Sequence, residues 1–517
     1  MSNMKILSAA FSAGLFAAAT HGRASAAAAA CDTLASLTLP NTTITSAQLV
    51  AAGEFRLPAN PGGGGPPLAR ADDLPAFCRV AATLKPSADS DIKIEVWMPA
   101  ANWNGKFQGV GNGGWSGAIS YGPLGAALRR GYAAGSTDTG HAGGSGSFAL
   151  GHPEKLTDFA YRAVHEMTVK AKAIVAAFYG SGPRSSYWTG CSSGGKQGLK
   201  EAQRFPADYD GIVAGAPANF WTHLMASGNW IGHATLKDPA SYIPREKYAV
   251  VHKAALDACD ALDGVKDGLI EDPVRCRFDP KTLLCTGGDD PACLTAPQVE
   301  AARKIYTGAI NSRTAKEIFP GLEPGSELGW APMAGGPDAF PITADHFKYV
   351  VFKDPSWDFR TLNFDRDVEL ADKLDNIDGG LLNATDPNMK EFFGRRGKLL
   401  LYHGWNDQLI APRNTINYYK NVVGAAGGPA KAADSVRLFM VPGMTHCAGG
   451  EGPSSFDALS AMEQWVETGK APNEIVASHM TGGVADRTRP LCSYPLVAQY
   501  KGTGSVDDAA SFVCKTP

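Results

Sequence analysis

The motif Gly190-Cys191-Ser192-Ser193-Gly194 lies between two segments of opposite character. Ser185–Thr189 before it has the composition of a short strand, and Lys196–Arg204 after it has the pattern of a helix. A G-x-S-x-G motif in this context is typical of a nucleophile elbow, where glycines permit a sharp turn that exposes the serine hydroxyl. We therefore predict that Ser192 is a nucleophile at the end of a sheet strand.

Strand and helix patterns alternate around this motif. Four further segments are predicted strands: Asp91–Met98, Lys106–Val110, Tyr132–Ser136 and Gly211–Ala214. Ala160–Tyr179 has the periodicity of a long helix. This alternation indicates a parallel sheet covered on both faces, and with the elbow it predicts an α/β-hydrolase fold. The alternation stops near Trp221 and resumes with the apolar strands Lys398–Tyr402 and Val436–Val441.

The chain of 517 residues is long enough for more than one domain. We predict an α/β-hydrolase catalytic domain of residues 27–220 and 397–517, with a large inserted lid domain of residues 221–396. Residues 1–26 have the pattern of a secretory signal peptide, with an apolar run after Lys5 and a cleavage site at Ala24-Ser25-Ala26. We therefore expect a secreted or periplasmic protein.

Charge and hydropathy argue against two classes of partner. The net charge is −3 and the chain has no basic tract, so we expect no binding to nucleic acid. No stretch after the signal reaches about 18 uninterrupted apolar residues, so we expect no membrane partner.

Ten cysteines in an exported chain indicate disulfide bonds. Proximity in sequence suggests Cys259–Cys276, Cys285–Cys293 and Cys492–Cys514, which leaves Cys31–Cys78 and Cys191–Cys447. Lipidation is an alternative for Cys31, although the alanines before it form a poor lipobox.

Acyl transfer by a serine requires a base and a carboxylate that orients the base. In α/β-hydrolases both follow the serine in the chain, on loops after late strands. Asp407 follows Lys398–Tyr402 and His446 follows Val436–Val441, so we predict a triad of Ser192, Asp407 and His446. A Cys191–Cys447 bridge would place Ser192 close to His446, since bridged Cα atoms lie about 4.4–6.8 Å apart.

Other residues are candidates for the same roles. Asp365, Asp367 and Asp375 are alternative carboxylates, and His403 and His141 are alternative bases. His403 is close to Asp407 in the same loop, and His141 precedes the serine, which breaks the expected order.

The oxyanion hole requires two donors. The backbone N–H of Ser193 is one of them, because it follows the nucleophile directly. The loop Gly111-Asn112-Gly113-Gly114 can supply the second donor from Gly113 or Gly114, and the sequence does not choose between them.

The segment Asp260–Ile270 in the expected lid is acidic and contains two glycines. Three carboxylates and backbone carbonyls suit a hard cation such as calcium. The spacing is not that of an EF-hand, because Leu262, Gly264 and Val265 occupy the third, fifth and sixth positions. A solvated acidic turn is the alternative, but a Cys259–Cys276 bridge around the loop favours a rigid structural site.

With these residues in view, the chain resembles the tannase and feruloyl esterase family over nearly all of its length after the signal peptide. The motifs that carry the resemblance are Gly190–Gly195, Ser136–His141, Tyr161–Glu166, Leu294–Val299 and His446-Cys447. The resemblance implies a Ser192–His446–Asp407 triad beside a Cys191–Cys447 disulfide. It also implies a lid calcium ion held by the side chains of Asp260, Asp263 and Asp267 and the carbonyls of Val265 and Leu269.

Members of this family hydrolyse esters of phenolic or aromatic acids, and the lid forms the acid-binding pocket. The resemblance therefore implies a serine carboxylic ester hydrolase that acts on a small aromatic-acid ester through an acyl-enzyme. Hydrolysis of a terephthalate monoester, peptide hydrolysis and non-catalytic binding of an aromatic ligand or polysaccharide are alternatives. Ser193 stands where relatives often carry Thr or Glu, which affects substrate preference rather than mechanism.

Overall fold

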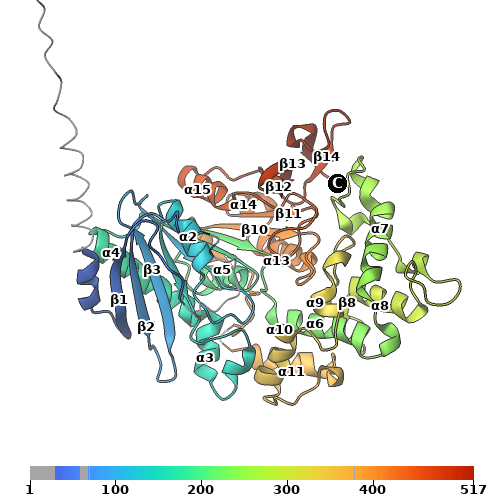
Figure 1. Cartoon of the computed structure of the whole chain (residues 1–517), viewed down its shortest axis with the longest axis horizontal. Coiled ribbons are helices and arrows are strands. Elements are labelled where there is room, and N and C mark those ends of the chain that lie inside the picture. Colours follow the sequence, from blue (N-terminus) through green and yellow to red (C-terminus); the bar gives the residue numbers. More distant parts are fainter. Residues whose placement is uncertain (1–29, 59–67, 69, 378) are drawn as a thin grey trace, which may run out of the picture.

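The computed structural model describes residues 30–58, 68, 70–377 and 379–517 (Figure 1). The predicted signal peptide, residues 1–26, lies outside the described residues. A nine-stranded sheet forms the centre of the catalytic part, in the order β1-β2-β3-β5-β4-β6-β7-β10-β11. Its strands are β1 Thr42–Val50, β2 Phe77–Leu84, β3 Ile92–Pro99, β4 Lys106–Val110, β5 Ala133–Thr137, β6 Ser185–Cys191, β7 Gly211–Gly215, β10 Lys398–Gly404 and β11 Val436–Val441.

The sheet is mixed, and the predicted parallel arrangement does not extend to one edge. From β5 through β11 the neighbouring strands run parallel, whereas β1, β2, β3 and β5 pair antiparallel. β1 and β2 were not predicted from the sequence. β1 is an edge strand of mostly half-buried and exposed residues, so it lacks the apolar run that marks the central strands.

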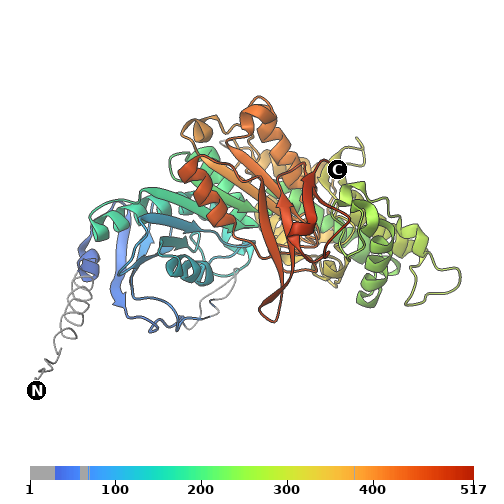
Figure 2. The same cartoon turned by 90° about the horizontal axis from the view of Figure 1, so that it is seen from above.

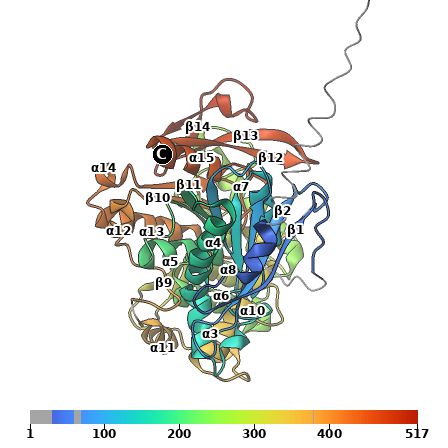
Figure 3. The ribbon, with the colours of Figure 1, turned by 90° about the vertical axis from the view of Figure 1, so that its left-hand side faces the viewer.

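Helices cover both faces of the sheet. One face packs against α4 Ala163–Tyr179, α5 Ser193–Arg204 and α13 Pro412–Ala425 (Figure 3). The other face packs against α2 Tyr121–Arg129 and α15 Ala458–Thr468. Every residue of β4, β5 and β7 is therefore buried, as expected for strands in the middle of three layers.

The chain between β7 and β10 forms a separate, mainly helical region, drawn in green to yellow on the right and lower part of Figure 1. Its elements are α6 Trp221–Leu236, α7 Tyr248–Cys259, α8 Ala296–Thr307, β8 Gly308–Ile310, β9 Glu317–Pro320, α9 Ala331–Ala334, α10 Pro341–Asp345, α11 Arg366–Asp375 and α12 Lys390–Gly394. Its hydrophobic core includes Trp221, Trp330 and Phe347, and it extends to Trp115 and Phe159 of the catalytic part. We call residues 221–396 the lid below.

The C-terminal residues leave the sheet and form two hairpins beside the lid (Figure 2). β12 Glu474–Thr481 pairs with β13 Val484–Cys492, and β14 Val497–Tyr500 pairs with β15 Phe512–Lys515. The backbone N–H of Ala498 donates to Glu271 in the lid at 2.9 Å.

Five disulfides link this structure, and their pairs are those expected from the sequence: Cys31–Cys78, Cys191–Cys447, Cys259–Cys276, Cys285–Cys293 and Cys492–Cys514. Among the described residues, no helix has both the length and the hydropathy needed to cross a membrane.

Candidate active site

Ser192 occupies the tight turn between β6 and α5. Its backbone has φ 62° and ψ −122°, in the left-handed region that a non-glycine residue adopts only under strain. The Ser192 N–H donates to the Gly215 carbonyl at 3.0 Å, and the Ser192 carbonyl accepts from Lys196 N–H at 3.0 Å. A Cβ atom at Gly190 would lie 2.4 Å from the Gly194 carbonyl oxygen, so the first glycine of the motif allows this close turn.

The register of the parallel strands brings the candidate triad to one edge of the sheet. Cys191 pairs with Gly215 of β7, which in turn pairs with Tyr402 of β10. β11 ends at Val441, opposite Gly404. The loops that carry Asp407 and His446 therefore begin at the same carboxyl edge as the turn that carries Ser192.

His446 and Asp407 are joined directly. The His446 Nδ1 atom lies 2.7 Å from Asp407 Oδ2, while Asp407 Oδ1 accepts from the backbone N–H groups of Leu409 at 2.8 Å and Ile410 at 2.9 Å. The Asp407 side chain is fully buried. These bonds fix the carboxylate and leave the other ring nitrogen of His446 free to act on a hydroxyl.

The two groups shift each other's pKa. Burial alone would raise the pKa of Asp407, but the charge of His446 and hydrogen bonds from His403 and His446 outweigh it and lower that pKa well below its usual range. Burial alone would lower the pKa of His446, but the charge and hydrogen bond of Asp407 raise it above 6.5. The pair therefore favours an ionised carboxylate beside a basic imidazole.

The Cys191–Cys447 disulfide joins the two segments that carry the nucleophile and the base. Its Cα atoms are 5.9 Å apart. Ser192 and His446 both line one cavity of about 670 Å³, which also contains both half-cystines. The structure thus brings Ser192 and His446 together, with Asp407 behind His446.

The alternative carboxylates lie in the lid and accept hydrogen bonds from its backbone. Asp365 accepts from the Ser312 N–H, Asp367 accepts from the Asn363 N–H, and Asp375 accepts from the N–H groups at 382 and 383. Each of them holds a turn of the lid.

The alternative base His141 is buried on the glycine-loop side. Its Nε2 atom lies 2.8 Å from the Trp115 carbonyl oxygen, and its ring stacks on Phe148. Burial lowers the pKa of His141 to about 4.

His403 has a role that the sequence analysis missed. Its Nε2 atom lies 3.0 Å from Asp407 Oδ2 and 3.0 Å from the Ile410 carbonyl oxygen, and its Nδ1 atom lies 2.7 Å from Thr415 Oγ1. Since a carbonyl only accepts, Nε2 carries the proton and donates it toward Asp407. A histidine in an apolar strand, four residues before the carboxylate, was the available signal for this contact.

The glycine loop is anchored to the elbow helix. The Asn112 N–H donates to Gln197 Oε1 at 3.1 Å, and the Ser193 hydroxyl donates to the Gly114 carbonyl at 2.9 Å. Gly113 and Gly114 both line the cavity of Ser192. The Ser193 side chain, for which only an effect on substrate preference was expected, thus positions the loop that was expected to supply the second oxyanion donor.

The lid contributes to the same cavity through Ile342 of α10, which lines it together with Leu409 and Tyr402 of the catalytic part. The indole N–H of Trp115, which follows the glycine loop, donates to the Ile342 carbonyl at 2.9 Å. The cavity wall is therefore mainly apolar beside the nucleophile, and it is built by both parts of the chain.

The acidic lid loop turns its carboxylates toward its own backbone. Asp260 accepts from the N–H groups of Asp267 and Gly268, and Asp263 accepts from the Val265 N–H, each at 3.1 Å. Asp267 also accepts from the Leu269 N–H. Within the described chain, Asp260, Asp263 and Asp267 do not bring three oxygens within 4.8 Å of one another.

Negative charge is nevertheless crowded at this loop. Burial, with a contribution from nearby Asp267, raises the pKa of Asp263 to about 6. Burial raises the pKa of Glu271 to about 8, and its buried Oε2 has no hydrogen-bond partner in the described structure. Arg489 of β13 forms an ion pair with Asp267. The donor types fit a hard cation, although the loop would have to close around it.

Comparison with known proteins gives matches over most of the chain. A family model described as tannase and feruloyl esterase matches residues 78–515. An uncharacterized esterase of Xanthomonas campestris is 41% identical and covers 94% of this chain and 91% of its own sequence. A probable feruloyl esterase B-1 of Aspergillus fumigatus is 36% identical, with 85% of each chain covered.

A solved structure gives the same result. The crystal structure of feruloyl esterase B from Aspergillus oryzae superposes with a TM-score of 0.88 at 32% identity, covering 95% of this chain and 100% of the other. Because the family model, the sequence relatives and this structure all match over most of the chain, the protein belongs to the tannase and feruloyl esterase family, whose members are carboxylic ester hydrolases.

Proposed function

We propose that this protein is an exported serine esterase that cleaves esters of phenolic or aromatic acids through an acyl-enzyme on Ser192. The observation that carries the proposal is the His446–Asp407 hydrogen bond of 2.7 Å at the wall of the cavity into which the strained elbow of Ser192 opens. A nucleophile, a base and an orienting carboxylate in chain order on this fold are the requirements for acyl transfer.

In the first half-reaction, Ser192 Oγ attacks the ester carbonyl carbon while His446 Nε2 accepts the hydroxyl proton. The oxyanion accepts hydrogen bonds from the Ser193 N–H and from Gly113 or Gly114. When the intermediate collapses, the carbon–oxygen bond to the alcohol breaks and His446 returns its proton to the leaving alkoxide. Asp407 holds the Nδ1–H throughout and stabilises the imidazolium.

In the second half-reaction, water attacks the acyl carbonyl and His446 accepts its proton. Collapse of this intermediate restores the Ser192 hydroxyl with the proton from His446 and releases the acid. The same residues thus serve both steps, and water replaces the proton that left with the alcohol.

The shape and chemistry of the cavity support an aromatic acid as the acyl group. A volume of about 670 Å³ accommodates a ring, and Trp115, Ile342 and Leu409 provide an apolar wall. The names of the relatives, which include feruloyl esterases, point to the same substrate class. A terephthalate monoester presents a ring of similar size and is the second candidate substrate.

A substrate panel tests this function. The wild type and Ser192→Ala are compared on methyl gallate, methyl ferulate, chlorogenic acid and a terephthalate monoester, with an amide analogue of the best ester. We expect turnover of at least one aromatic ester by the wild type, none above background by the folded variant, and slower amide cleavage. Equal turnover by both proteins would refute a serine mechanism, and a preference for the amide would favour a peptidase.

We also propose a structural calcium ion in the lid, held by the side chains of Asp260, Asp263 and Asp267 and the carbonyls of Val265 and Leu269. The crowded carboxylates and the unpaired oxygen of Glu271 support it, because a cation would offset their charge.

Export to an oxidising compartment is supported by the signal-like residues 1–26 and by the five disulfides. Comparison of the N-terminal residue of the mature protein with the expected cleavage site tests this proposal.

A further inference from the structure

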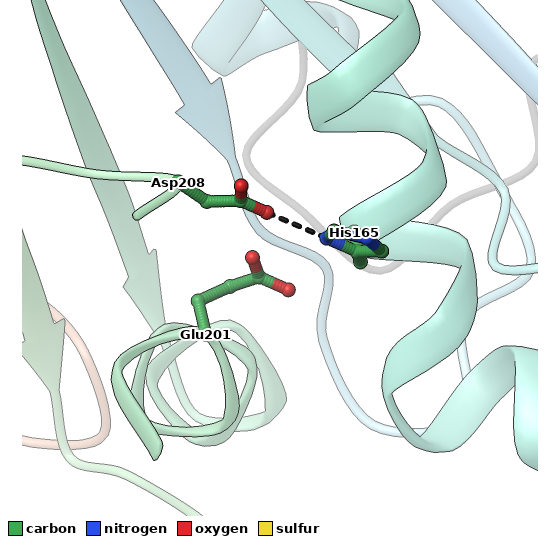
Figure 4. Close-up of side chains that lie close together, drawn as sticks. All are labelled: His165, Glu201 and Asp208. Atoms are coloured by element: carbon green, nitrogen blue, oxygen red, sulfur yellow. Dashed lines mark hydrogen bonds and ion pairs between the residues drawn. The ribbon is translucent and has the colours of Figure 1, made fainter. Parts of the chain in front are cut away.

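A second cluster of ionisable side chains lies outside the esterase site (Figure 4). His165 of α4 belongs to the Tyr161–Glu166 motif, which the esterase mechanism does not use. Its Nδ1 atom lies 2.7 Å from Oδ2 of Asp208, in the segment before β7. Glu201 of α5 points toward this pair, and one ligand atom from each of the three residues lies within 4.8 Å of the others.

Glu201 is the feature of this cluster that requires an explanation. The residue is only 1% exposed, and neither of its carboxylate oxygens has a hydrogen-bond partner in the described structure. A buried carboxylate without a partner is costly, and most such groups are paired or bind a metal. Burial, and then the charge of Asp208, raise the pKa of Glu201 well above its usual range.

The nearby positive charge of Lys172 only partly offsets the two carboxylates, because the pKa of Glu201 stays raised despite it. Lys172 is close by, but its ammonium group donates to the backbone carbonyl of Asp208. Across the described residues, neither Glu201 nor the Asp208 side chain forms an ion pair with a lysine or arginine. The His165 ring stacks on Phe205 with centroids 3.7 Å apart, which fixes the plane of the imidazole.

We propose that His165, Glu201 and Asp208 bind one divalent transition-metal ion, with zinc as the representative ion. One imidazole and two carboxylates supply three ligands. A water molecule can be the fourth ligand of a tetrahedral site, because His165 is partly exposed to solvent. The imidazole favours zinc over calcium, which takes oxygen ligands. Ligand atoms about 2.1 Å from a tetrahedral ion lie roughly 3.4 Å apart, so the 2.7 Å contact of His165 with Asp208 must open by less than about 1 Å.

The position of the cluster assigns a structural role to the ion. Glu201 lies nine residues after Ser192, which along a helix corresponds to about 13 Å. An ion at this distance does not reach the reacting ester. It instead joins α4, α5 and the segment before β7, and so supports the helix that carries the elbow.

Metal binding to the untagged mature protein tests the proposal. The protein is stripped with a chelator, returned to buffer with calcium, and titrated with Zn²⁺ or Co²⁺, and bound metal is measured by mass spectrometry after gel filtration. The test variant is Glu201→Gln, which keeps the shape of the side chain and removes its charge. The matched control is Glu166→Gln. Glu166 follows His165 in the chain and pairs with Lys170.

We expect the wild type and Glu166→Gln to bind one equivalent of Zn²⁺ or Co²⁺. Both should have a higher Tm with the bound metal than without it. Glu201→Gln should bind the ion roughly tenfold or more weakly. Equal binding by the wild type and Glu201→Gln would overturn the proposal. So would the absence of any Zn²⁺-dependent change in the wild type, because the two carboxyl groups would then share a proton instead.

Two further measurements keep the test decisive if Glu201→Gln does not fold. His165→Gln is titrated in the same way, and the visible spectrum of Co²⁺ bound to the wild type is recorded. We expect the spectrum of a four-coordinate site with nitrogen and oxygen ligands, and its loss in His165→Gln. An octahedral spectrum like that of aqueous Co²⁺, or an unchanged spectrum in the variant, would contradict the assignment.

Discussion

Asp407 accepts hydrogen bonds from two histidines on one oxygen. His446 lies at 2.7 Å and His403 at 3.0 Å from Oδ2, while backbone N–H groups occupy Oδ1. The carboxylate therefore has little freedom to rotate or to accept a proton. Because His403 is buried and also contacts the Ile410 carbonyl, it positions Asp407 rather than acting on a substrate.

Asp407→Asn is expected to keep the fold and to lower kcat by about 10³–10⁴, because an amide does not hold the correct tautomer of His446. The base works in its neutral form, so the activity rises as pH increases through the pKa of His446. Asp407 raises that pKa, and the acid limb of kcat/KM should therefore lie at higher pH in the wild type than in the variant. Identical acid limbs would contradict the assignment of Asp407.

His403→Gln tests the positioning role. We expect kcat to fall about tenfold with KM unchanged, since one hydrogen bond to a charged group contributes about 1.5 kcal/mol or more. Thr415→Val is the control, because it removes the contact on the other ring nitrogen and leaves the bond to Asp407. A change in KM alone, or no change in kcat, would contradict the positioning role and leave His403 with a packing role only.

The elbow element combines β6, the Ser192 turn and α5 with a disulfide to the loop after β11. The bridge closes a loop of 256 residues and fixes the distance between the segments of Ser192 and His446. Its contribution to stability is roughly 2–4 kcal/mol. Its greater effect is expected on the geometry of the base.

The double variant Cys191→Ala, Cys447→Ala should remain folded and lose at least about tenfold in kcat, because a shift of His446 by about 1 Å is sufficient for a large loss. The control pair is Cys285→Ala, Cys293→Ala, which removes a short-range bridge in the lid. Circular dichroism checks the fold and steady-state kinetics gives kcat. Equal kcat values for the two double variants would show that the Cys191–Cys447 bridge does not determine the active-site geometry.

Patterns in the sequence predicted the central elements well, because they are buried on both faces. The predicted strands Lys106–Val110 and Val436–Val441 have the observed bounds, and the elbow segments differ by a few residues at their ends. β1 was missed because this edge strand is only half-buried. β2 lies inside the sheet, and its buried residues alternate with half-buried ones. Their antiparallel pairing also needs no helix between strands, so the alternation gave no sign of it.

The lid and the catalytic part form one molecule around a shared core. Trp115 and Trp221, from the two parts, lie 4.7 Å apart between ring centroids, and Ile342 of the lid reaches the cavity of Ser192. The alternation of strands and helices stops after β7 and resumes at β10, and the chain between them is mainly helical. No pattern in the sequence indicated which lid residue would line the cavity of the nucleophile, because that position depends on how distant helices pack.

Removal of calcium tests the proposed lid site. Binding to the folded state alone adds about 2.7 kcal/mol at a ligand concentration of 100 times Kd, so a calcium-selective chelator should lower the Tm and added calcium should restore it. Asp263→Asn should lose this response, whereas Asp257→Asn, which changes an exposed carboxylate of α7, should keep it. A wild-type Tm that does not change with calcium would contradict the site.

Formation of a covalent acyl group on Ser192 can be observed by mass spectrometry. The wild type is mixed with an activated aromatic ester, quenched in acid within the first turnover, and digested. The expected result is an acyl-sized mass increase on the peptide that contains Ser192, which disappears on longer incubation and is absent in Ser192→Ala. Turnover of the ester without any acylated Ser192 peptide, or with acylation of another residue, would contradict the mechanism.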